Sequence, residues 1–407
     1  MRKFFLKNTV RYYLLIALAL GFLFLSNDFG ATDVQKTAIV VAAGIDRQED
    51  TFIVTSQVAI PQSSKQGKAS EAVQIVSRGN TVGEAFDEIN AKTGWYPKLV
   101  FCDLILFGES AKTADIFDAL DFFLRDEYLS HNCHLAVCNG TAKDLLNTSA
   151  LVDPSSSTAM KKVLSAHAER VGTVLPTTLR EFSIGYFSEG KSGYLPILTT
   201  EPQQEKIGKN DKEQQPNNNQ ENSGTSASEG EKSNKNEDKP VFSARETALF
   251  VKGKWVDTLN NNETFALASV LSKLRLASYT LQDNGDACTL NIRRNSPAMK
   301  LRADKDDRFT LQVEVECTAG ILDYSKSQPI DKIGDAGDIP KDFFAVAQAR
   351  LAEEIKGVYE KCRTANCDLF GVRERFMKYG KRRFRAQANT ILSNTSAQVS
   401  VRFKNVR

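Results

Sequence analysis

The sequence lacks the short motifs on which several common kinds of enzyme depend. It contains no G-x-S-x-G nucleophile elbow, no H-E-x-x-H zinc motif and no G-x-G-x-x-G dinucleotide fingerprint. Acidic pairs at Asp306 and Asp307, and at Asp335 and Asp338, lie among Gly and Lys residues, where a solvated loop or a weak cation site accounts for them. We therefore expect no catalytic residues and no cofactor, and the chain is not predicted to be an enzyme.

Cysteine is thinly spread along the chain. Seven cysteines among 407 residues are an odd number, and they do not form the dense framework of a small disulfide-rich domain. Buried free thiols are the expected state of most of them. Cys362 and Cys367, which have four residues between them near a predicted helix end, are the best candidate for a disulfide.

Histidine is scarce, and no metal site is predicted. Three of the chain's ligand-type residues, His131, Cys133 and His134, lie close to Cys138, and imidazole and thiolate groups bind zinc. On a strand, however, His131 and Cys133 would face one side of a sheet while His134 and Cys138 face the other. A strand with buried thiols is therefore the expected structure.

A formal match to the phosphate-binding Walker A motif occurs at residues 185–192, GYFSEGKS. A real phosphate-binding loop is followed by a helix whose first amides hold the phosphates. Here Gly193 and Pro196 follow the match, and both residue types oppose a helix at that point. The match is interpreted as a coincidence.

One hydrophobic run of uncharged residues stands near the N-terminus, at residues 12–25. Arg2, Lys3, Lys7 and Arg11 precede it, which predicts a cytoplasmic N-terminus and export of the remaining chain. Because no cleavage site of the A-x-A type follows, residues 1–31 are expected to be an uncleaved signal anchor, with a cleaved signal peptide as the alternative. No cysteine lies near the end of the run, so no lipid attachment is expected there.

The exported part divides at a long polar segment. Between residues 201 and 239 the only aliphatic residues are Ile207 and Ala227, so residues 201–240 are predicted to be a disordered linker. The linker would separate an N-terminal region, residues 32–200, which has room for two subdomains, from a C-terminal domain, residues 241–407. The whole chain has an ordinary globular composition, with 41% hydrophobic and 25% charged residues.

Predicted strands and helices alternate in both regions. A capping box at Thr81 and Glu84 begins a predicted helix, and apolar residues at helical spacing predict a long helix over residues 340–362. The predicted strands cover residues 38–46, 51–60, 99–107, 134–137, 246–257, 287–293, 309–317 and 397–403. The fold class is therefore predicted to be mixed α/β (α+β), with helices packed on mixed sheets.

Several of these segments resemble, in order and spacing, the C-subunits of nutrient germinant receptors of spore-forming bacteria, the Ger(x)C family. The matching segments are Gly44-Ile45-Asp46, residues 121–126, residues 131–146, Leu195-Pro196-Ile197, Glu263-Thr264 and Asp368-Leu369-Phe370-Gly371. The resemblance covers nearly all of the chain after Ala38. Most members of the family are lipoproteins with an N-terminal cysteine, which this chain lacks.

The resemblance implies a non-catalytic, membrane-attached receptor subunit on the outer side of the spore inner membrane, needed for receptor assembly and signal coupling. Its implied partners are a membrane A-subunit and a transporter-like B-subunit. Gly44, Asp46, Asp368, Phe370 and Gly371 are the positions carried over from the family, each expected to serve the fold or a partner contact.

Other functions and partners stay open at this point. An exported, membrane-tethered solute-binding protein would hold a small nutrient in an apolar pocket, and a cell-envelope hydrolase could use carboxylates from distant segments. The basic run from Arg373 to Arg385 is expected to be a solvated face or to contact an anionic membrane surface or acidic partner. Nucleic acid is not an expected partner outside the cytoplasm.

Overall fold

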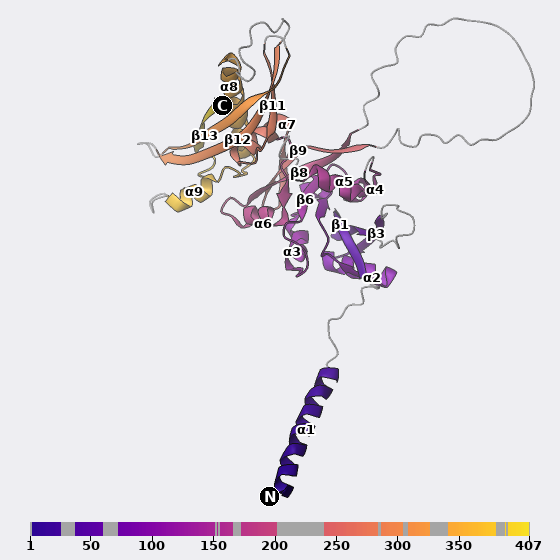
Figure 1. Cartoon of the computed structure of the whole chain (residues 1–407). Coiled ribbons are helices and arrows are strands. Elements are labelled where there is room, and N and C mark those ends of the chain that lie inside the picture. Colours follow the sequence, from indigo (N-terminus) through magenta and orange to yellow (C-terminus); the bar gives the residue numbers. More distant parts are fainter. Residues whose placement is uncertain are drawn as a thin grey trace, which may run out of the picture.

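Two mixed β-sheets with helices packed on them form the folded part of the chain (Figure 1). The computed structural model describes residues 2–25, 37–59, 72–150, 153, 155–165, 172–201, 240–283, 286–303, 308–325, 341–379, 387 and 390–406. This arrangement confirms the predicted mixed α/β class.

The first sheet has the strand order β10-β9-β8-β6-β5-β1-β2-β3, while β4 pairs with β1 and β7 with β6. Its centre is parallel, because β1, β5, β6 and β8 run in the same direction, and both of its ends are antiparallel. The strands are β1 (Thr37–Gln48), β2 (Thr51–Ala59), β3 (Ala72–Gly79), β4 (Tyr96–Lys98), β5 (Leu104–Phe107), β6 (His134–Cys138), β7 (Thr177–Thr178), β8 (Ser192–Glu201), β9 (Val241–Val251) and β10 (Lys254–Leu259).

Helices cover both faces of this sheet. They are α2 (Val82–Thr93), the short 3₁₀ helix η2 (Glu109–Lys112), α3 (Phe117–Arg125), α4 (Ala142–Asn147), α5 (Ser156–Val163) and α6 (Leu179–Phe187). Neighbouring residues of β5 are buried in separate clusters: Ile105 lies in the cluster with α2, α3 and α6, and Leu104 and Leu106 lie in the cluster with α4 and α5. A strand buried on both faces has an unbroken apolar run, which is why the sequence pattern indicated it. The strand expected over residues 99–107 is shorter than predicted, because residues 99–102 form a turn before it.

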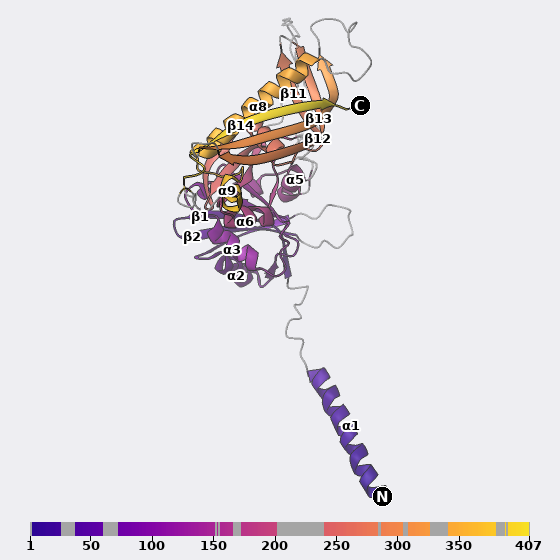
Figure 2. The same ribbon diagram turned by 90° about the vertical axis from the view of Figure 1, so that its left-hand side faces the viewer.

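The second sheet has the order β11-β12-β13-β14. Its strands are β11 (Ala277–Asp283), β12 (Asp286–Ala303), β13 (Phe309–Ser325) and β14 (Thr395–Asn405), and its helices are α7 (Asn261–Val270), α8 (Lys341–Thr364) and α9 (Val372–Tyr379). Through most of β13 every second residue is buried, as expected for a sheet with one solvated face. Figure 2 shows α8 running along β14, against which it packs.

The first sheet continues beyond the long polar segment. β8 and β9 pair in antiparallel fashion, and Glu201, the last residue of β8, lies opposite Val241, the first residue of β9. A sequence boundary at residue 240 therefore does not separate the two sheets, because β9 and β10 complete the first one. The predicted disorder of the segment concerns residues 202–239, which lie outside the described residues.

The N-terminal run forms helix α1 (Arg2–Leu25). Large apolar side chains between Val10 and Leu20 are exposed, for example Tyr13 at 70% and Leu18 at 67%. In the described residues no helix reaches the length and apolarity required to cross a membrane. Whether the segment is an anchor or is cleaved stays a prediction.

All seven cysteines are buried free thiols. The expectation of buried free thiols is therefore confirmed, and the suggested disulfide between Cys362 and Cys367 is absent. These two residues are instead joined through the backbone, where the Cys367 N–H donates to the Cys362 carbonyl at 2.8 Å. The hydrogen bond closes the end of α8.

We expect the thiols to be unreactive in the folded chain. Burial raises the pKa of both Cys138 and Cys317 to about 12, so neither forms the reactive thiolate at neutral pH. Ellman's reagent should label no cysteine in the native chain and seven in the unreduced chain unfolded in guanidinium. Fewer than seven after unfolding would reveal a disulfide and contradict this expectation.

Candidate functional site

The turn at residues 368–371 joins the end of α8 to the start of α9. The Asp368 carboxylate accepts hydrogen bonds from the backbone N–H groups of Val372, at 2.8 Å, and Arg373, at 2.7 Å. These are free amides of the first turn of α9, so the side chain caps that helix. Burial raises the pKa of Asp368 above its usual value, and the two amide donors oppose this rise.

Phe370 and Gly371 fix the remainder of the 368–371 turn. Phe370 is buried, and its ring packs edge-to-face against Tyr359 of α8 with centroids 5.2 Å apart. Gly371 has φ +65°, a left-handed conformation that glycine adopts at little cost. The Arg375 guanidinium donates to the carbonyls of Phe370, at 2.6 Å, and Gly371, at 3.1 Å, so the basic side chain holds the turn together.

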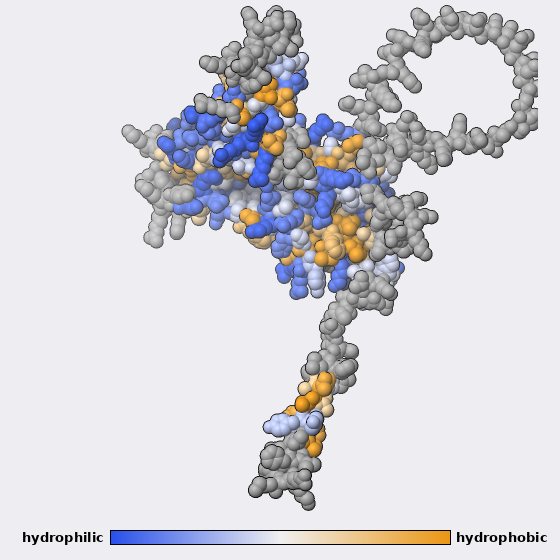
Figure 3. Space-filling view, in the orientation of Figure 1, coloured by the Kyte–Doolittle hydropathy of each residue, from blue (hydrophilic) through white to orange (hydrophobic). Residues whose placement is uncertain are grey.

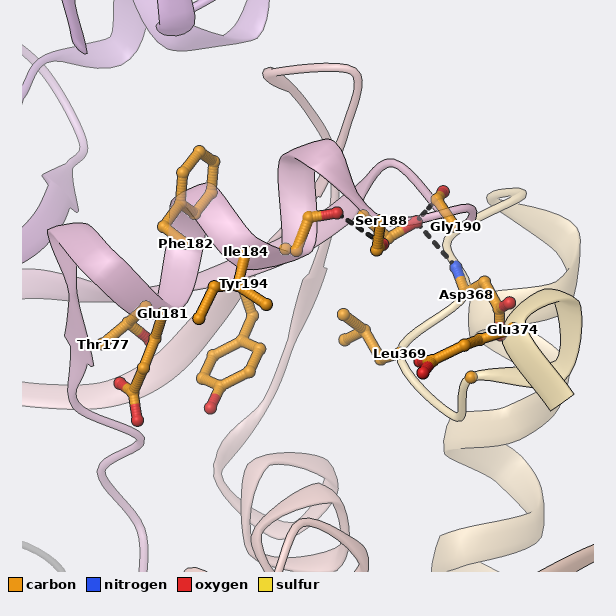
Figure 4. Close-up of a pocket in the computed structure, with 14 residues that line it drawn as sticks. Thr177, Glu181, Phe182, Ile184, Ser188, Gly190, Tyr194, Asp368, Leu369 and Glu374 are labelled. Atoms are coloured by element: carbon orange, nitrogen blue, oxygen red, sulfur yellow. Dashed lines mark hydrogen bonds between the residues drawn. The ribbon is translucent and has the colours of Figure 1, made fainter. Parts of the chain in front are cut away.

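The same turn contacts the connection between α6 and β8 (Figure 4). The backbone N–H of Asp368 donates to Ser192 Oγ at 2.8 Å, and that hydroxyl donates to the carbonyl of Gly190 at 2.7 Å. Arg373 Nη1 also donates to the Gly190 carbonyl, at 3.3 Å. A second contact lies nearby, where the Cys367 thiol faces the Phe250 carbonyl of β9 at 3.5 Å.

A pocket of about 260 Å³ lies at this junction. The α6–β8 side contributes Glu181, Ile184 and Tyr194, and the other side contributes Leu369 and Glu374. Figure 4 shows these side chains on opposite walls. We call this contact between the 368–371 turn and the α6–β8 connection the inter-sheet joint.

The Walker A match lies in this joint. It covers the end of α6, the turn with Gly190, and the first residue of β8, Ser192. The order is helix, turn and strand, whereas a phosphate-binding loop has strand, loop and helix. The match is therefore not a phosphate-binding loop, but its serine hydroxyl accepts a hydrogen bond from the Asp368 N–H within the inter-sheet joint.

The first family-like motif has a similar local structure. Asp46, near the end of β1, accepts from the N–H groups of Ala142 at 2.8 Å and Lys143 at 3.1 Å, and so caps α4. A Cβ on Gly44 would lie 2.7 Å from Leu146 Cδ1 of α4. A Cβ on Gly108 would lie only 1.9 Å from Asp46 Oδ1. Glycine at both positions therefore lets β1, α4 and Asp46 approach closely.

Asp46 gives a prediction about pH. Burial raises its pKa, although the two backbone amides that donate to it act in the opposite direction. The folded state therefore binds the proton more tightly than the unfolded chain, in which the pKa is about 3.9. The stability contributed by this proton is fully present below the unfolded pKa and is lost as pH rises through the folded pKa.

We therefore expect the free energy of unfolding of the native chain, minus that of Asp46→Asn, to fall as pH rises through this window. Urea unfolding of both proteins at a series of pH values above about 3 measures the difference. A difference that grows with pH would show that Asp46 is more acidic in the folded chain, contrary to this expectation.

The other candidate residues are not brought together as a metal or anion site. Cys133 is buried in the cluster with α2 and α3, and Cys138 in the cluster on the opposite face of the sheet. In the part of the chain that the structure describes, no three His, Cys, Asp or Glu side chains could hold a metal ion. The acidic pairs at residues 306–307 and 335–338, and basic residues 381–385, lie outside that part.

Family models match the sequence and a solved structure matches the fold, whereas no curated protein matches the chain. The crystal structure of the GerBC protein matches with a TM-score of 0.51 and 15% identity, over 89% of this chain and 96% of that one. The model of the spore germination protein N-terminal domain matches residues 30–200, and the spore germination B3/GerAC-like C-terminal model matches residues 245–406. The chain therefore belongs to the GerAC-like, or Ger(x)C, family of spore germination proteins.

Proposed function

We propose that the chain is the C-subunit of a spore nutrient germinant receptor, a non-catalytic part needed for receptor assembly and signal coupling. The observation that carries the proposal is that models of both family domains match in order, over residues 30–200 and 245–406. The partners would be a membrane A-subunit and a transporter-like B-subunit. The soluble domains would lie on the outer side of the spore inner membrane, attached through residues 1–31.

The inter-sheet joint supports a role in coupling. Its hydrogen bonds tie the 368–371 turn, which packs on α8, to the α6–β8 connection of the first sheet. Residues of β9 and β10 also share one hydrophobic cluster with the second sheet, so a change at one sheet can displace the other. Gly44 and Asp46 would hold the first domain in shape, and Asp368, Phe370 and Gly371 would maintain the joint. We propose that the N-terminal region, the polar segment and the C-terminal domain are separate functional units. β9 and β10, which follow the polar segment, belong to the first sheet.

Affinity recovery from spore membranes tests this function. The chain is tagged at its C-terminus and isolated from detergent-solubilised membranes of dormant spores, and the recovered proteins are identified by mass. Recovery of two integral membrane proteins, one of them transporter-like, is the expected result. If the chain is recovered alone, the solute-binding hypothesis is favoured. A rise in the melting temperature of the chain with amino acids or sugars would then support that hypothesis.

A further inference from the structure

An exposed aromatic segment lies beside the start of β1. β4 pairs in parallel with residues 37–39 of β1, so it lies where the chain enters the first sheet from the N-terminal helix. Around β4 and the turn after it, five large side chains are exposed: Trp95 at 38%, Tyr96 at 55%, Val100 at 46%, Phe101 at 59% and Tyr128 at 59%. We call these five residues the aromatic rim. Figure 3 shows hydrophobic residues on the lower part of the folded body, near the β1 and α2 labels of Figure 1, on a scale that does not count Trp and Tyr as hydrophobic; the rim is defined by the exposed fractions of its five side chains.

The aromatic rim is built on fixed backbone. Gly94 ends α2 in a left-handed conformation, and its N–H donates to the Asn90 carbonyl. Leu99, within the same segment, is buried, and the Cys102 N–H donates to its carbonyl at 2.9 Å. The exposed side chains are therefore presented by a constrained turn rather than by a chain end.

The chemistry of the rim suits the boundary between lipid and water. Trp and Tyr concentrate at that boundary because one part of each ring is apolar and another part is polar. The one charged residue among residues 95–101 is Lys98, whose ammonium lies 4.8 Å from the centre of the Tyr128 ring. A lysine with an apolar stem can reach lipid headgroups while its neighbours enter the acyl boundary.

Chain length keeps the rim within reach of the segment proposed as the anchor. α1 ends at Leu25 and β1 begins at Thr37. The residues between them span at most roughly 40 Å when fully extended. Within α1, exposed apolar side chains such as Leu14 and Ile16 also favour lipid contact.

We propose that the aromatic rim rests on the lipid surface beside the anchor and so fixes the orientation of the N-terminal domain on the membrane. This inference rests on the membrane attachment in the proposed function. A seated domain would present the inter-sheet joint and the second sheet in a constant direction toward membrane partners.

Tryptophan fluorescence of the full chain tests the proposal. The chain contains two tryptophans, and Trp255 is buried, so a quencher in the lipid should act mainly on Trp95. The full chain is reconstituted into phosphatidylcholine vesicles with and without brominated acyl chains. We expect brominated lipid to quench a substantial fraction of the emission in the native chain and almost none in Trp95→Phe.

Two further variants separate the rim from general hydrophobicity. Val100→Ser combined with Phe101→Ser should lower the quenching of Trp95 several-fold, since both side chains are exposed and their loss leaves the core intact. Leu322→Ser, which removes a side chain that is 57% exposed on β13, should leave the quenching unchanged.

The outcomes distinguish this inference from the proposed function. The vesicles are also floated on a density gradient to show whether the chain is attached to them. A chain that floats with the vesicles but shows no quenching of Trp95 overturns the lipid contact and leaves the anchor intact. A chain that does not float overturns both membrane claims, while recovery of membrane partners tests the receptor role separately. Shielding of Trp95 from aqueous acrylamide only after solubilised spore membrane proteins are added would assign the rim to a protein partner and would likewise overturn the proposal.

Discussion

Gly185→Ala is expected to lower the free energy of unfolding by about 3 kcal/mol, near the upper end of the usual cost of an oversized side chain. A Cβ at this position would lie 2.3 Å from the Ser192 carbonyl oxygen, far inside contact distance. The atom it meets belongs to the backbone, so a side-chain rotation cannot relieve the overlap. The end of α6 and the start of β8 must separate, which would also displace the Ser192 hydroxyl from Asp368.

Urea unfolding measures the loss, and Gly357→Ala is the matched control. Gly357 lies inside α8, and a Cβ there would meet no atom within 4 Å. Since glycine weakens a helix interior, the control should gain up to about 1 kcal/mol. Equal stability of Gly185→Ala and the native chain would show that α6 and β8 do not approach as closely as described.

Asp368→Ala is expected to cost about 3 kcal/mol as well. The substitution removes the acceptor for the Val372 and Arg373 amides, and unsatisfied buried donors cost about 1–3 kcal/mol each. Part of this cost is recovered where water reaches the Arg373 amide, which is only partly buried. Because α9 then begins without its cap, the 368–371 turn should also loosen its contact with Gly190.

Two variants test this interpretation by denaturant unfolding. Asp121→Ala removes an exposed ion pair with Arg125 at 2.8 Å, and should cost less than about 1 kcal/mol. Asp368→Asn keeps one acceptor oxygen and should fall between Asp368→Ala and the native chain. If Asp368→Ala costs no more than Asp121→Ala, the cap is not a principal stabilising contact. Under the proposed function, Asp368→Ala should also reduce recovery of the membrane partners from spores.

Local patterns predicted much of the secondary structure. The long helix expected over residues 340–362 is α8, Lys341–Thr364. Thr81 caps α2 as expected, since its hydroxyl accepts from the Glu84 N–H at 3.1 Å. The Glu84 carboxylate accepts from the backbone N–H of Asn80 at 2.7 Å, whereas in a standard capping box it would accept from the backbone N–H of the next residue, Thr81.

Sequence patterns were weaker where irregular or distant pairing decides the structure. The strand expected at residues 287–293 extends to Ala303 as β12, because the register shift between Ile292 and Arg294 interrupts the alternation on which the prediction depended. The two strands expected within residues 246–257 are β9 and β10, but their place in the first sheet was not predicted, and neither was β11. Strand partners are chosen by packing across the whole fold, which a local pattern does not contain.

The candidate site shows the same division. The positions of Asp46 and Asp368 came from resemblance to a family, whereas their hydrogen-bond partners came only from the structure. Ser192 is 176 residues from Asp368 in sequence, and nothing near either residue indicates the contact. Gly108 is similar. A side chain at this position would overlap Asp46 of the neighbouring strand β1, which the sequence around Gly108 does not indicate.

The pairing of β8 with β9 has a consequence for a severed chain. The two strands hold each other from Ser192 opposite Val251 to Glu201 opposite Val241, so the polar segment closes a hairpin instead of carrying the connection between two separate bodies. A protease site inserted between Glu201 and Val241 would therefore yield two fragments that remain one particle on gel filtration. The two fragments, expressed from separate genes, should associate, because β9 of the second fragment pairs with β8 at the edge of the first.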